Sequence, residues 1–273
     1  MSKCQVIRIE TAADERLEPF RDLRHRNLTH FSQRFVAEGW NVVERLLKSD
    51  FETEFVLCAP KYLDRILEVW KDPHTVYVLD DEQFPELVGF QFHRGALAFA
   101  KRNRLPPLRS VIEGSAALPP SCLWCGVVGV QDPENFGTIL RTCAGLGIDT
   151  VLIGNDCCDP FSRRVLRTSM GNSLKLQLIS AEQLEADMSQ LRQQAGFQVL
   201  ASSLAEDSQS LQEVQWRARR LILFGNEGHG LPLAVQQASD IRLRIDMSLG
   251  TDSLNVSVAA GIILHFAARL APV

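Results

Sequence analysis

The second half of the chain alternates short apolar runs with longer segments of helical period. The apolar runs, which predict buried strands, lie at 125–130, 150–154, 174–179, 197–202, 220–225 and 241–245. Helices are expected at 136–146, 181–194 and 253–270, with a short one after Pro232. Strands that alternate with helices are typical of an α/β fold with an open, mostly parallel sheet.

The last predicted helix, SLNVSVAAGIILHFAARL, is apolar almost all round. A helix with this pattern must be covered by other parts of the protein on most of its sides. We therefore expect it to be buried, with His265 packed in the core.

The first hundred residues show the same alternation on a smaller scale. A helix is indicated by the apolar positions Val42, Val43, Leu46 and Leu47, and a second helix by KYLDRILEVW. FETEFVLCA and TVYVLD predict strands, and GALAFAKR, residues 95–102, predicts a short helix. This part of the sequence therefore predicts a small α/β domain.

A compositional break separates the two halves. The segment KRNRLPPLRSVIEGSAALPPS, residues 101–121, contains two Pro-Pro pairs and shows no sustained period. The predicted organisation is a small α/β domain at 1–105, a linker at 106–120 and a larger α/β domain at 121–273.

Composition narrows the class of protein. Hydrophobic residues make up 45% of the 273 positions, which is enough for a substantial core. The formal net charge of −4 supplies no general attraction for polyanions, so any nucleic-acid contact needs a local basic patch. The first residues, MSKCQVIRIETAADERLEPF, contain no signal-peptide core, and no apolar run reaches the roughly 18 residues of a membrane helix. We expect a soluble, cytoplasmic protein without a membrane partner.

The 7 cysteines are odd in number and irregular in spacing, as is typical of thiols in a reducing compartment. Cys122 and Cys125 form a C-x-x-C pair, but no second pair and no close pair of histidines accompanies it. We interpret this pair as part of a strand and expect no metal.

The turn at 131–137 leads from a predicted strand into a helix, where ligands bind in α/β sheets. Gly137 permits a close approach of the backbone, Asn135 offers a donor and an acceptor, and Arg141 can bind a phosphate. An alternative interpretation is that Asn135 caps the helix and Arg141 is an ordinary surface charge.

A second loop favours the ligand interpretation. LILFGNEGHGLP, residues 221–232, runs from an apolar strand into three glycines, with Asn226 and Glu227 among them. Closely spaced glycines allow sharp turns that leave main-chain groups free for a ligand. The loop does not match the G-x-G-x-x-G fingerprint of dinucleotide-binding proteins.

A third loop, IDMSLGTDSLNVSVAAG, residues 245–261, ends a strand and starts the last helix. It carries Asp252, Ser253 and Asn255, and capping by Asp252 or Ser253 explains one of these polar residues but not all three.

Together the three loops resemble a known family. N-F-G-x-x-x-R at 135–141, G-N-E-G-x-G-L at 225–231 and S-L-N-V-S-x-A at 253–259 are similar to the three motifs of the SpoU or TrmH family of RNA ribose 2′-O-methyltransferases, members of the SPOUT superfamily. The resemblance covers residues 115–273 and is specific, because three independent loops agree.

The first domain resembles the substrate-binding domain of this family, a small module akin to certain ribosomal proteins. The cues are FVAEGWNVVERLL and FHRGALAFA, in which His93 and Gly95 occupy the family's usual turn. This resemblance favours RNA as the substrate and partner.

The third motif departs from the family pattern. Asp246 stands where the family usually has Pro, and Leu249-Gly250 replaces a Gly-Gly pair. We expect Asp246 to alter the cofactor loop or to contact a neighbouring chain.

The resemblance implies a fold and a cofactor. It implies a deep trefoil knot that forms a pocket for S-adenosylmethionine, and a homodimer packed through an apolar patch that includes the last helix. Carried over by position, the cofactor-binding residues are Gly225, Ile245 and Leu254, through their backbone, with Leu223, Asn226 and Met247 nearby.

The resemblance also implies the chemistry of the site. Arg141 is implicated in activating the ribose hydroxyl, and the catalytic residues around it are Asn135, Glu227, Ser253 and Asn255. A guanidinium is a poor base, so we expect Arg141 to orient the phosphate and the ribose. We expect it to accept the proton of the hydroxyl only if Glu227 or the RNA phosphate makes that transfer possible. Glu227 could equally be a scaffold residue that binds backbone amides.

Phosphate contacts are expected from basic residues outside the motifs. The candidates are Arg163, Arg164, Arg167, Lys175, Lys101, Arg102 and Arg104, all of which could equally be solvated surface charges. The predicted function is transfer of a methyl group to a ribose 2′-hydroxyl of rRNA or tRNA. The alternative is a catalytically inactive RNA-binding protein on the same fold.

Overall fold

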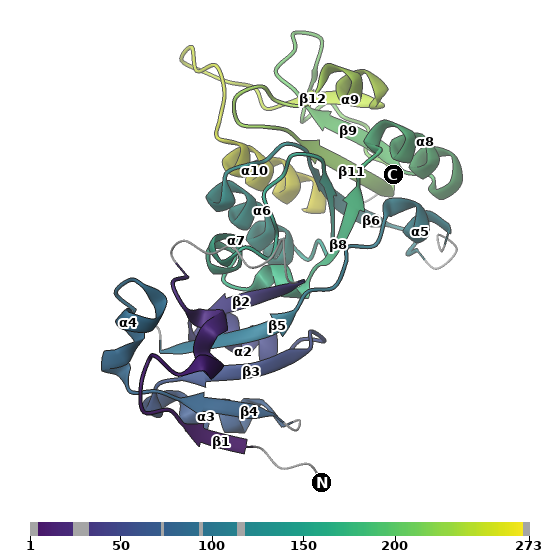
Figure 1. The fold of residues 1–273 in the computed structure, drawn as a ribbon. Helices are drawn as coiled ribbons and strands as arrows, with labels where there is room; N and C mark the ends of the chain where they lie inside the picture. The colour runs from purple at the N-terminus through teal and green to yellow at the C-terminus, as the bar shows by residue number, and fades with distance from the viewer. Residues whose placement is uncertain (1–4, 24–32, 72–73, 93–94, 114–117, 270–273) are drawn as a thin grey trace. The chain divides into compact units, whose positions relative to one another are not determined.

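The computed structural model describes residues 5–23, 33–71, 74–92, 95–113 and 118–269. The chain divides into two compact units (Figure 1), of which one comprises Met1–Asn103 and Asp159–Lys175 and the other Arg104–Cys158 and Leu176–Val273. The first is called the N-terminal unit and the second the C-terminal unit below.

The C-terminal unit is built on a seven-stranded sheet in which every pair of neighbouring strands is parallel. In the order β10-β12-β9-β11-β6-β7-β8, the strands are Gln209–Ser210, Ile241–Arg244, Gln198–Ser202, Arg219–Phe224, Cys122–Val127, Thr150–Gly154 and Gln177–Ala181. The predicted α/β class and the parallel sheet are confirmed. The two-residue strand β10 was not predicted.

Helices cover both faces of this sheet (Figure 1). They are α5 (Leu108–Glu113), α6 (Pro133–Leu146), α8 (Leu184–Ala195), α9 (Leu233–Ala238) and α10 (Val256–Arg269). Leu221 and Leu223 of β11 join the core beneath α8, whereas Arg220, on the alternate face, donates a hydrogen bond to the Ala267 carbonyl of α10 at 2.7 Å. Because successive side chains of a strand point to opposite faces, α8 and α10 lie on opposite sides of the sheet.

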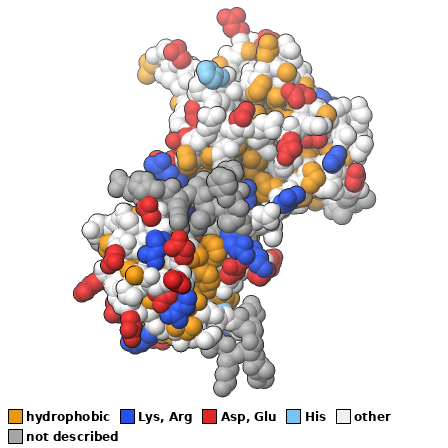
Figure 2. All heavy atoms as spheres, viewed as in Figure 1, with side chains coloured by type: hydrophobic (Ala, Val, Ile, Leu, Met, Phe, Trp, Pro, Cys, Tyr) orange, Lys and Arg blue, Asp and Glu red, His pale blue; other side chains and the backbone are white. Residues whose placement is uncertain are grey.

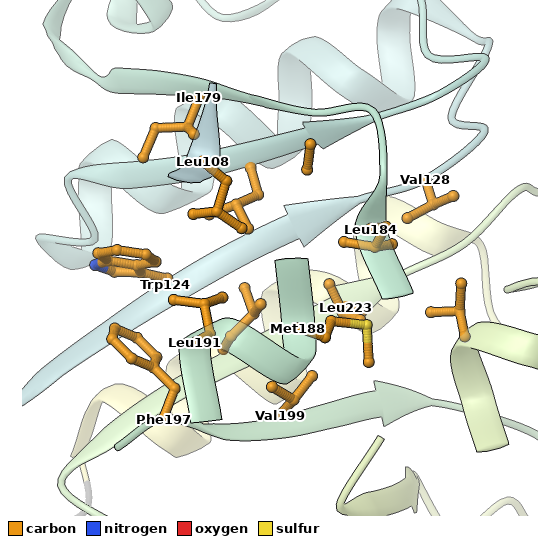
Figure 3. Packing of buried hydrophobic residues seen from close by; sticks show 14 of the residues in the cluster. Leu108, Trp124, Val128, Ile179, Leu184, Met188, Leu191, Phe197, Val199 and Leu223 are labelled. Atoms are coloured by element: carbon orange, nitrogen blue, oxygen red, sulfur yellow. The ribbon is translucent and has the colours of Figure 1, made fainter. Parts of the chain in front are cut away.

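The core on the α8 side contains large apolar side chains from strands and helices (Figure 3). Leu223 lies among Met188, Leu184 and Val199, and Trp124 packs against Phe197 with ring centroids 4.4 Å apart. Leu108 of α5 joins the same cluster, so the segment predicted as a linker, 106–120, contributes to the core.

The prediction for the last helix is only partly correct. Its inner residues Ala260, Ile263, Leu264 and Ala267 are buried, as expected. His265 is exposed, and the solvent-exposed fractions of Val258 and Ile262 are 50% and 41%. His265 is therefore not a core residue, because α6 and the sheet cover one side of α10 and the other side stays open within a single chain.

The N-terminal unit contains a five-stranded mixed sheet. In the order β1-β4-β3-β5-β2, its strands are Gln5–Arg8, Thr75–Val78, Thr53–Cys58, Ala96–Lys101 and Arg34–Glu38, and β5 is antiparallel to both of its neighbours. Its helices are α2 (Trp40–Leu47), α3 (Leu63–Val69), α4 (Phe84–Val88) and α7 (Arg163–Thr168), with short 3-10 turns η1 (Glu15–Phe20), η2 (Pro60–Tyr62), η3 (Asp81–Gln83) and η5 (Asn172–Lys175). The predicted small α/β architecture is observed.

The prediction of a short helix at 95–102 was wrong, because this segment forms the inner strand β5. Residues 96–100 are all buried, since β5 lies between β3 and β2 and is covered on both faces. A strand covered on both faces loses the alternation of polar and apolar positions, and its alanines then suggest a helix. His93 lies outside the described residues.

The segment Asp159–Lys175 packs on strand β2 within the N-terminal unit. Phe161 contacts Phe35 with ring centroids 5.3 Å apart. Arg163 forms an ion pair at 2.8 Å with Glu38, whose solvent-exposed fraction is only 3%. The domain boundaries at 105 and 121 stay a prediction, because compactness alone does not show which segments fold together.

No helix in the described part of the chain is long and apolar enough to cross a membrane. The described cysteines are free thiols. Burial raises the pKa of the Cys58 thiol to about 12 and that of Cys122 to about 11, so both resist ionisation near neutral pH.

Candidate active site

Three loops of the C-terminal unit meet beyond the carboxyl ends of its strands. Strands β6 and β11 are neighbours in the sheet, so the turn before α6 and the glycine-rich loop after β11 lie side by side. The Asn226 side-chain amide donates to the Gly129 carbonyl at 2.8 Å and joins these two loops. The third loop follows β12 and leads into α10.

The first loop is shaped by a helix cap that differs from the expected one. Asp132, not Asn135, is the N-cap of α6, and its Oδ1 accepts hydrogen bonds from the backbone of Glu134 and Asn135, both at 2.8 Å. The side chain of Asn135 is therefore available for other contacts.

Asn135 connects all three loops. Its Nδ2 donates to Glu227 Oε1 at 2.9 Å, and its Oδ1 accepts from Asn255 Nδ2 at 2.9 Å. These bonds use both ends of one amide, so they fix its orientation. Three of the predicted catalytic residues thus form one hydrogen-bonded chain.

The second loop is closed on itself by Asn226. Its Oδ1 accepts from the backbone of Gly228 at 2.9 Å and of His229 at 3.1 Å, and its own backbone pairs with that of Gly230. A Cβ at Gly225 would overlap backbone atoms of Gly230 and Leu231. Only glycine at this position allows the loop to fold back so tightly.

The third loop also has an unexpected cap. Asn255, rather than Asp252 or Ser253, accepts from the backbone of Ser257 at 2.9 Å and from its hydroxyl at 2.7 Å at the start of α10. Asn255 therefore has two functions, because the same side chain begins the helix and holds Asn135.

A pocket of about 450 Å³ opens between the second and third loops. Of the predicted cofactor residues, it is lined by Gly225, Asn226, Ile245, Met247 and Leu254. This volume lies within the range of small-molecule sites. The close approach of backbone at Gly225 and the apolar surface of the lining suit a nucleoside ligand such as S-adenosylmethionine.

Leu223 does not line this pocket. Its side chain is fully buried and points into the core beneath α8 (Figure 3), so any contribution to binding would be indirect. Glu227 and Ser253 do line the pocket, and Glu227 connects it to the chain of amides described above.

Sequence reasoning missed a polar cluster at the rim. Arg242 and Arg244 line the pocket, and Asp246 accepts hydrogen bonds from Ser210 Oγ at 2.5 Å and from Arg244 Nε at 3.1 Å. These bonds hold the pKa of the Asp246 carboxyl below its ordinary value. The replacement of Pro by Asp in the third motif thus ties the cofactor loop to strand β10 of the same chain.

Arg141 stands apart from the pocket. It is exposed on α6, seven residues after Glu134 and three after Thr138, and so shares their face of the helix. Among the described residues it has no hydrogen-bond or ion-pair partner. Its guanidinium is open to a ligand from outside the chain.

The predicted RNA-binding cations are mostly paired within the N-terminal unit. Arg163 and Arg167 lie 2.8 and 3.9 Å from Glu38. Arg102 is 2.8 Å from Asp159 and Lys101 is 2.6 Å from Glu52. Lys101, Arg104, Arg164 and Lys175 are exposed. In the view of Figure 2, acidic and basic side chains are interspersed on the surface.

Comparison with known proteins agrees with this architecture. Residues 124–265 match the model of the SpoU rRNA Methylase family. The chain is 35% identical to an uncharacterized tRNA/rRNA methyltransferase of Mycobacterium tuberculosis over 92% of its length and 88% of the relative. It is 25% identical to the 23S rRNA guanosine 2′-O-methyltransferase RlmP of Bacillus subtilis, over 94% of this chain and 97% of that protein.

A solved structure shows the same fold. The AdoMet-bound rRNA methyltransferase of Sinorhizobium meliloti superposes with a TM-score of 0.82 at 23% identity, covering 97% of this chain and 98% of that one. The matched family model includes all three of the loops that form the pocket and the amide chain. The chain therefore belongs to the SpoU rRNA methylase family.

Proposed function

We propose that this protein transfers a methyl group from S-adenosylmethionine to a ribose 2′-hydroxyl of rRNA or tRNA. The observation that carries the proposal is the hydrogen-bonded chain of Glu227, Asn135 and Asn255 at the edge of the pocket. This arrangement places fixed polar groups beside a cavity of nucleoside size. The relative RlmP, a 2′-O-methyltransferase, supports the ribose as acceptor.

The pocket residues would hold the cofactor, whose sulfonium supplies the electrophilic methyl group. Backbone groups at Gly225, Ile245 and Leu254 would bind the adenosyl moiety, and Met247, which lines the same pocket, would contribute to its apolar surface. Asn226 acts indirectly, because its side chain is used to hold the loop closed. The trefoil knot of the family stays a prediction for this chain.

The acceptor hydroxyl would be positioned from the first loop. The exposed guanidinium of Arg141 binds an RNA phosphate and orients the ribose, since a guanidinium binds phosphate through paired N–H donors. Glu227 is a positioning residue, because its carboxylate accepts the Asn135 amide. Ser253 lies on the pocket wall, where its hydroxyl can hydrogen-bond to the ribose.

The protein would act in the cytoplasm as a homodimer. The exposed apolar side chains Val258 and Ile262 recur four residues apart on α10, as on a helix that packs against a partner. Pairing of two copies through this face would cover the open side of the helix. The candidates for phosphate contacts are Arg164, Lys175, Arg104 and Lys101, which are exposed, and Arg102, Arg163 and Arg167, which are half-buried.

Transfer of radiolabelled methyl from S-adenosylmethionine tests the proposal. Total RNA from a strain that lacks the gene is the acceptor, and RNA from the parent strain is the control, because its target is already modified. Label should enter the first RNA and not the second. An inactive RNA-binding protein would bind RNA yet give no heat on calorimetric titration with S-adenosylmethionine, and that result would refute the proposal.

A further inference from the structure

One pocket of the N-terminal unit shares no lining residue with the pocket of the C-terminal unit. It measures about 420 Å³, and its lining includes Trp40, Asn41, Tyr62 and Arg167. We refer to it as the Trp40 pocket. All of its lining residues belong to the N-terminal unit.

Two aromatic rings form one wall of the Trp40 pocket. Trp40, the first residue of α2, stacks on Tyr62 with ring centroids 5.9 Å apart and an interplanar angle of 28°. Both side chains are half-buried, so each keeps part of its ring accessible. An aromatic pair that only filled a core would be enclosed.

Gly95 fixes the position of this wall. Its φ of +62° lies in the left-handed region, and a Cβ there would overlap the ring of Tyr62. The turn singled out in the sequence as a feature of the substrate-binding domain therefore has a direct physical role, because its glycine makes room for Tyr62 beside Trp40.

Cations surround the two rings. The Arg65 guanidinium lies 4.8 Å from the centroid of Trp40, and Lys61 Nζ lies 5.7 Å from that of Tyr62. Arg65 and Lys61 are exposed. Arg167 adds a third cation on the pocket wall.

Acidic groups only partly neutralise these cations. Asp81 lies 3.1 Å from Lys61, and Glu38 lies 3.9 Å from Arg167. The carboxylate of Glu38 lies closer to the guanidinium of Arg163, at 2.8 Å, than to that of Arg167. The lining itself holds Arg167 and the carboxylate of Glu38, whereas Arg65 and Lys61 lie against the two rings without lining the pocket.

Accessible rings flanked by cations are the recognition chemistry of unpaired nucleotides. Every base has a face that stacks on an aromatic ring, and the phosphates on either side of it need positive charge. We propose that the Trp40 pocket binds an unpaired nucleotide of the RNA substrate, with its base stacked on Trp40 and its phosphates bound by Arg65 and Arg167. The inference rests on the proposed function, because it assigns a contact to the same RNA.

The test measures binding of a short fluorescein-labelled oligoadenylate to the full-length protein by anisotropy. Trp40→Ala should weaken binding by about 5- to 100-fold, since stacking contributes roughly 1–3 kcal/mol per base. Trp40→Phe keeps a ring and should retain most of the affinity. Tyr77→Ala is the matched control, because Tyr77 also contacts an arginine, Arg16, but lies outside the pocket.

Intrinsic fluorescence adds a signature that a purely structural role would not give. Oligoadenylate should quench the tryptophan emission of the unmodified protein, and Trp40→Phe should abolish this quenching while it still binds. Calorimetric titration with S-adenosylmethionine verifies that each variant keeps its C-terminal unit intact.

In methyl transfer to RNA, Trp40→Ala should raise KM for the RNA and leave kcat within about twofold. Equal oligoadenylate affinity for Trp40→Ala and the unmodified protein, or unchanged quenching in Trp40→Phe, would overturn the inference while methyl transfer still supported the proposed function. Failure of the unmodified protein to methylate any RNA would refute the proposed function. The oligoadenylate affinities would still show whether the Trp40 pocket binds an unpaired nucleotide.

Discussion

Asn135 and Asn255 each use both ends of their amide group, and together they set the geometry of the site at the scale of single residues. Asn135 donates to Glu227 and accepts from Asn255, whose own oxygen caps α10. The sequence motifs contain these residues, but their spacing does not show that they bond to one another. The structure thus gives a reason for the joint presence of three distant motifs.

Arg141 gives the first prediction at this scale. Arg141→Ala should lower kcat for methyl transfer by about 100-fold or more, a typical loss when one fixed donor to the reacting group is removed. Arg141→Lys should recover only part of the rate, because an ammonium lacks the paired donors of a guanidinium. The affinity for S-adenosylmethionine should stay unchanged, since Arg141 does not line the pocket.

The control for Arg141 is Arg109→Ala, which removes an exposed arginine of α5. This helix packs on α8, on the face of the sheet away from α10. A native rate for Arg141→Ala would contradict the role assigned to its guanidinium.

The glycine-rich loop gives the second prediction. Gly225→Ala should abolish binding of S-adenosylmethionine, because the added Cβ would overlap the backbone of Gly230 and Leu231. Gly228→Ala is the matched variant, since the nearest atom to its Cβ is Asn226 Oδ1 at 3.5 Å. Calorimetric titration measures both, and equal dissociation constants for the two variants would show that the loop is not the cofactor site.

At the scale of elements, α6 carries the first loop and depends on its cap. Asp132→Ala should lower the free energy of unfolding by about 1 kcal/mol, the usual effect of losing an N-cap side chain. Asp132→Asn keeps the acceptor oxygen and should restore most of this loss. Urea unfolding followed by circular dichroism measures the change. A fully native value for Asp132→Ala would mean that the cap does not stabilise α6.

Helices and strands with a clear pattern of apolar positions could be predicted from the sequence, and those without such a pattern could not. Most strands of the C-terminal sheet are continuous apolar runs, which identify them. Strand β5 was mistaken for a helix because both its faces are buried. Strand β10 has only two residues, which is too short for a recognisable pattern. Apolar runs rich in Val, Ile and Leu therefore identify buried strands, whereas a buried strand rich in alanine resembles a helix.

The site shows the same limit. Its glycines and amides lie within recognisable motifs, so Gly225, Asn135 and Asn255 could be named in advance. The two caps, Asp132 and Asn255, were not identified from the sequence, because the choice among neighbouring Asp, Ser and Asn residues depends on the exact turn. The bond between Asp246 and Ser210 joins residues far apart in the sequence, so it becomes visible only when β10 is placed beside β12.

At the scale of the whole molecule, the two units suggest a division of labour. The C-terminal unit contains the pocket and the amide chain, and the N-terminal unit contains the Trp40 pocket. Recognition of RNA by one unit and chemistry in the other would separate affinity for the substrate from the rate of transfer.

The proposed homodimer gives the prediction that belongs to this scale. Ile262→Asp should convert a dimer to a monomer, because the carboxylate would be buried without a partner in the apolar contact of α10. Sedimentation equilibrium should give twice the mass of one chain for the unmodified protein and the mass of a single chain for the variant. His265 is exposed one turn further along the same helix. The mass of the His265→Asp variant shows whether the contact between the two copies extends to this position. A monomeric unmodified protein would contradict the proposal.

The chemical position of the transferred methyl group tests the central claim most directly. RNA labelled by the protein and S-adenosylmethionine is digested to nucleosides and analysed by mass spectrometry. The three converging loops predict that the label is found in a nucleoside methylated on the 2′-oxygen of its ribose. A label found on a base instead would contradict this account of the site.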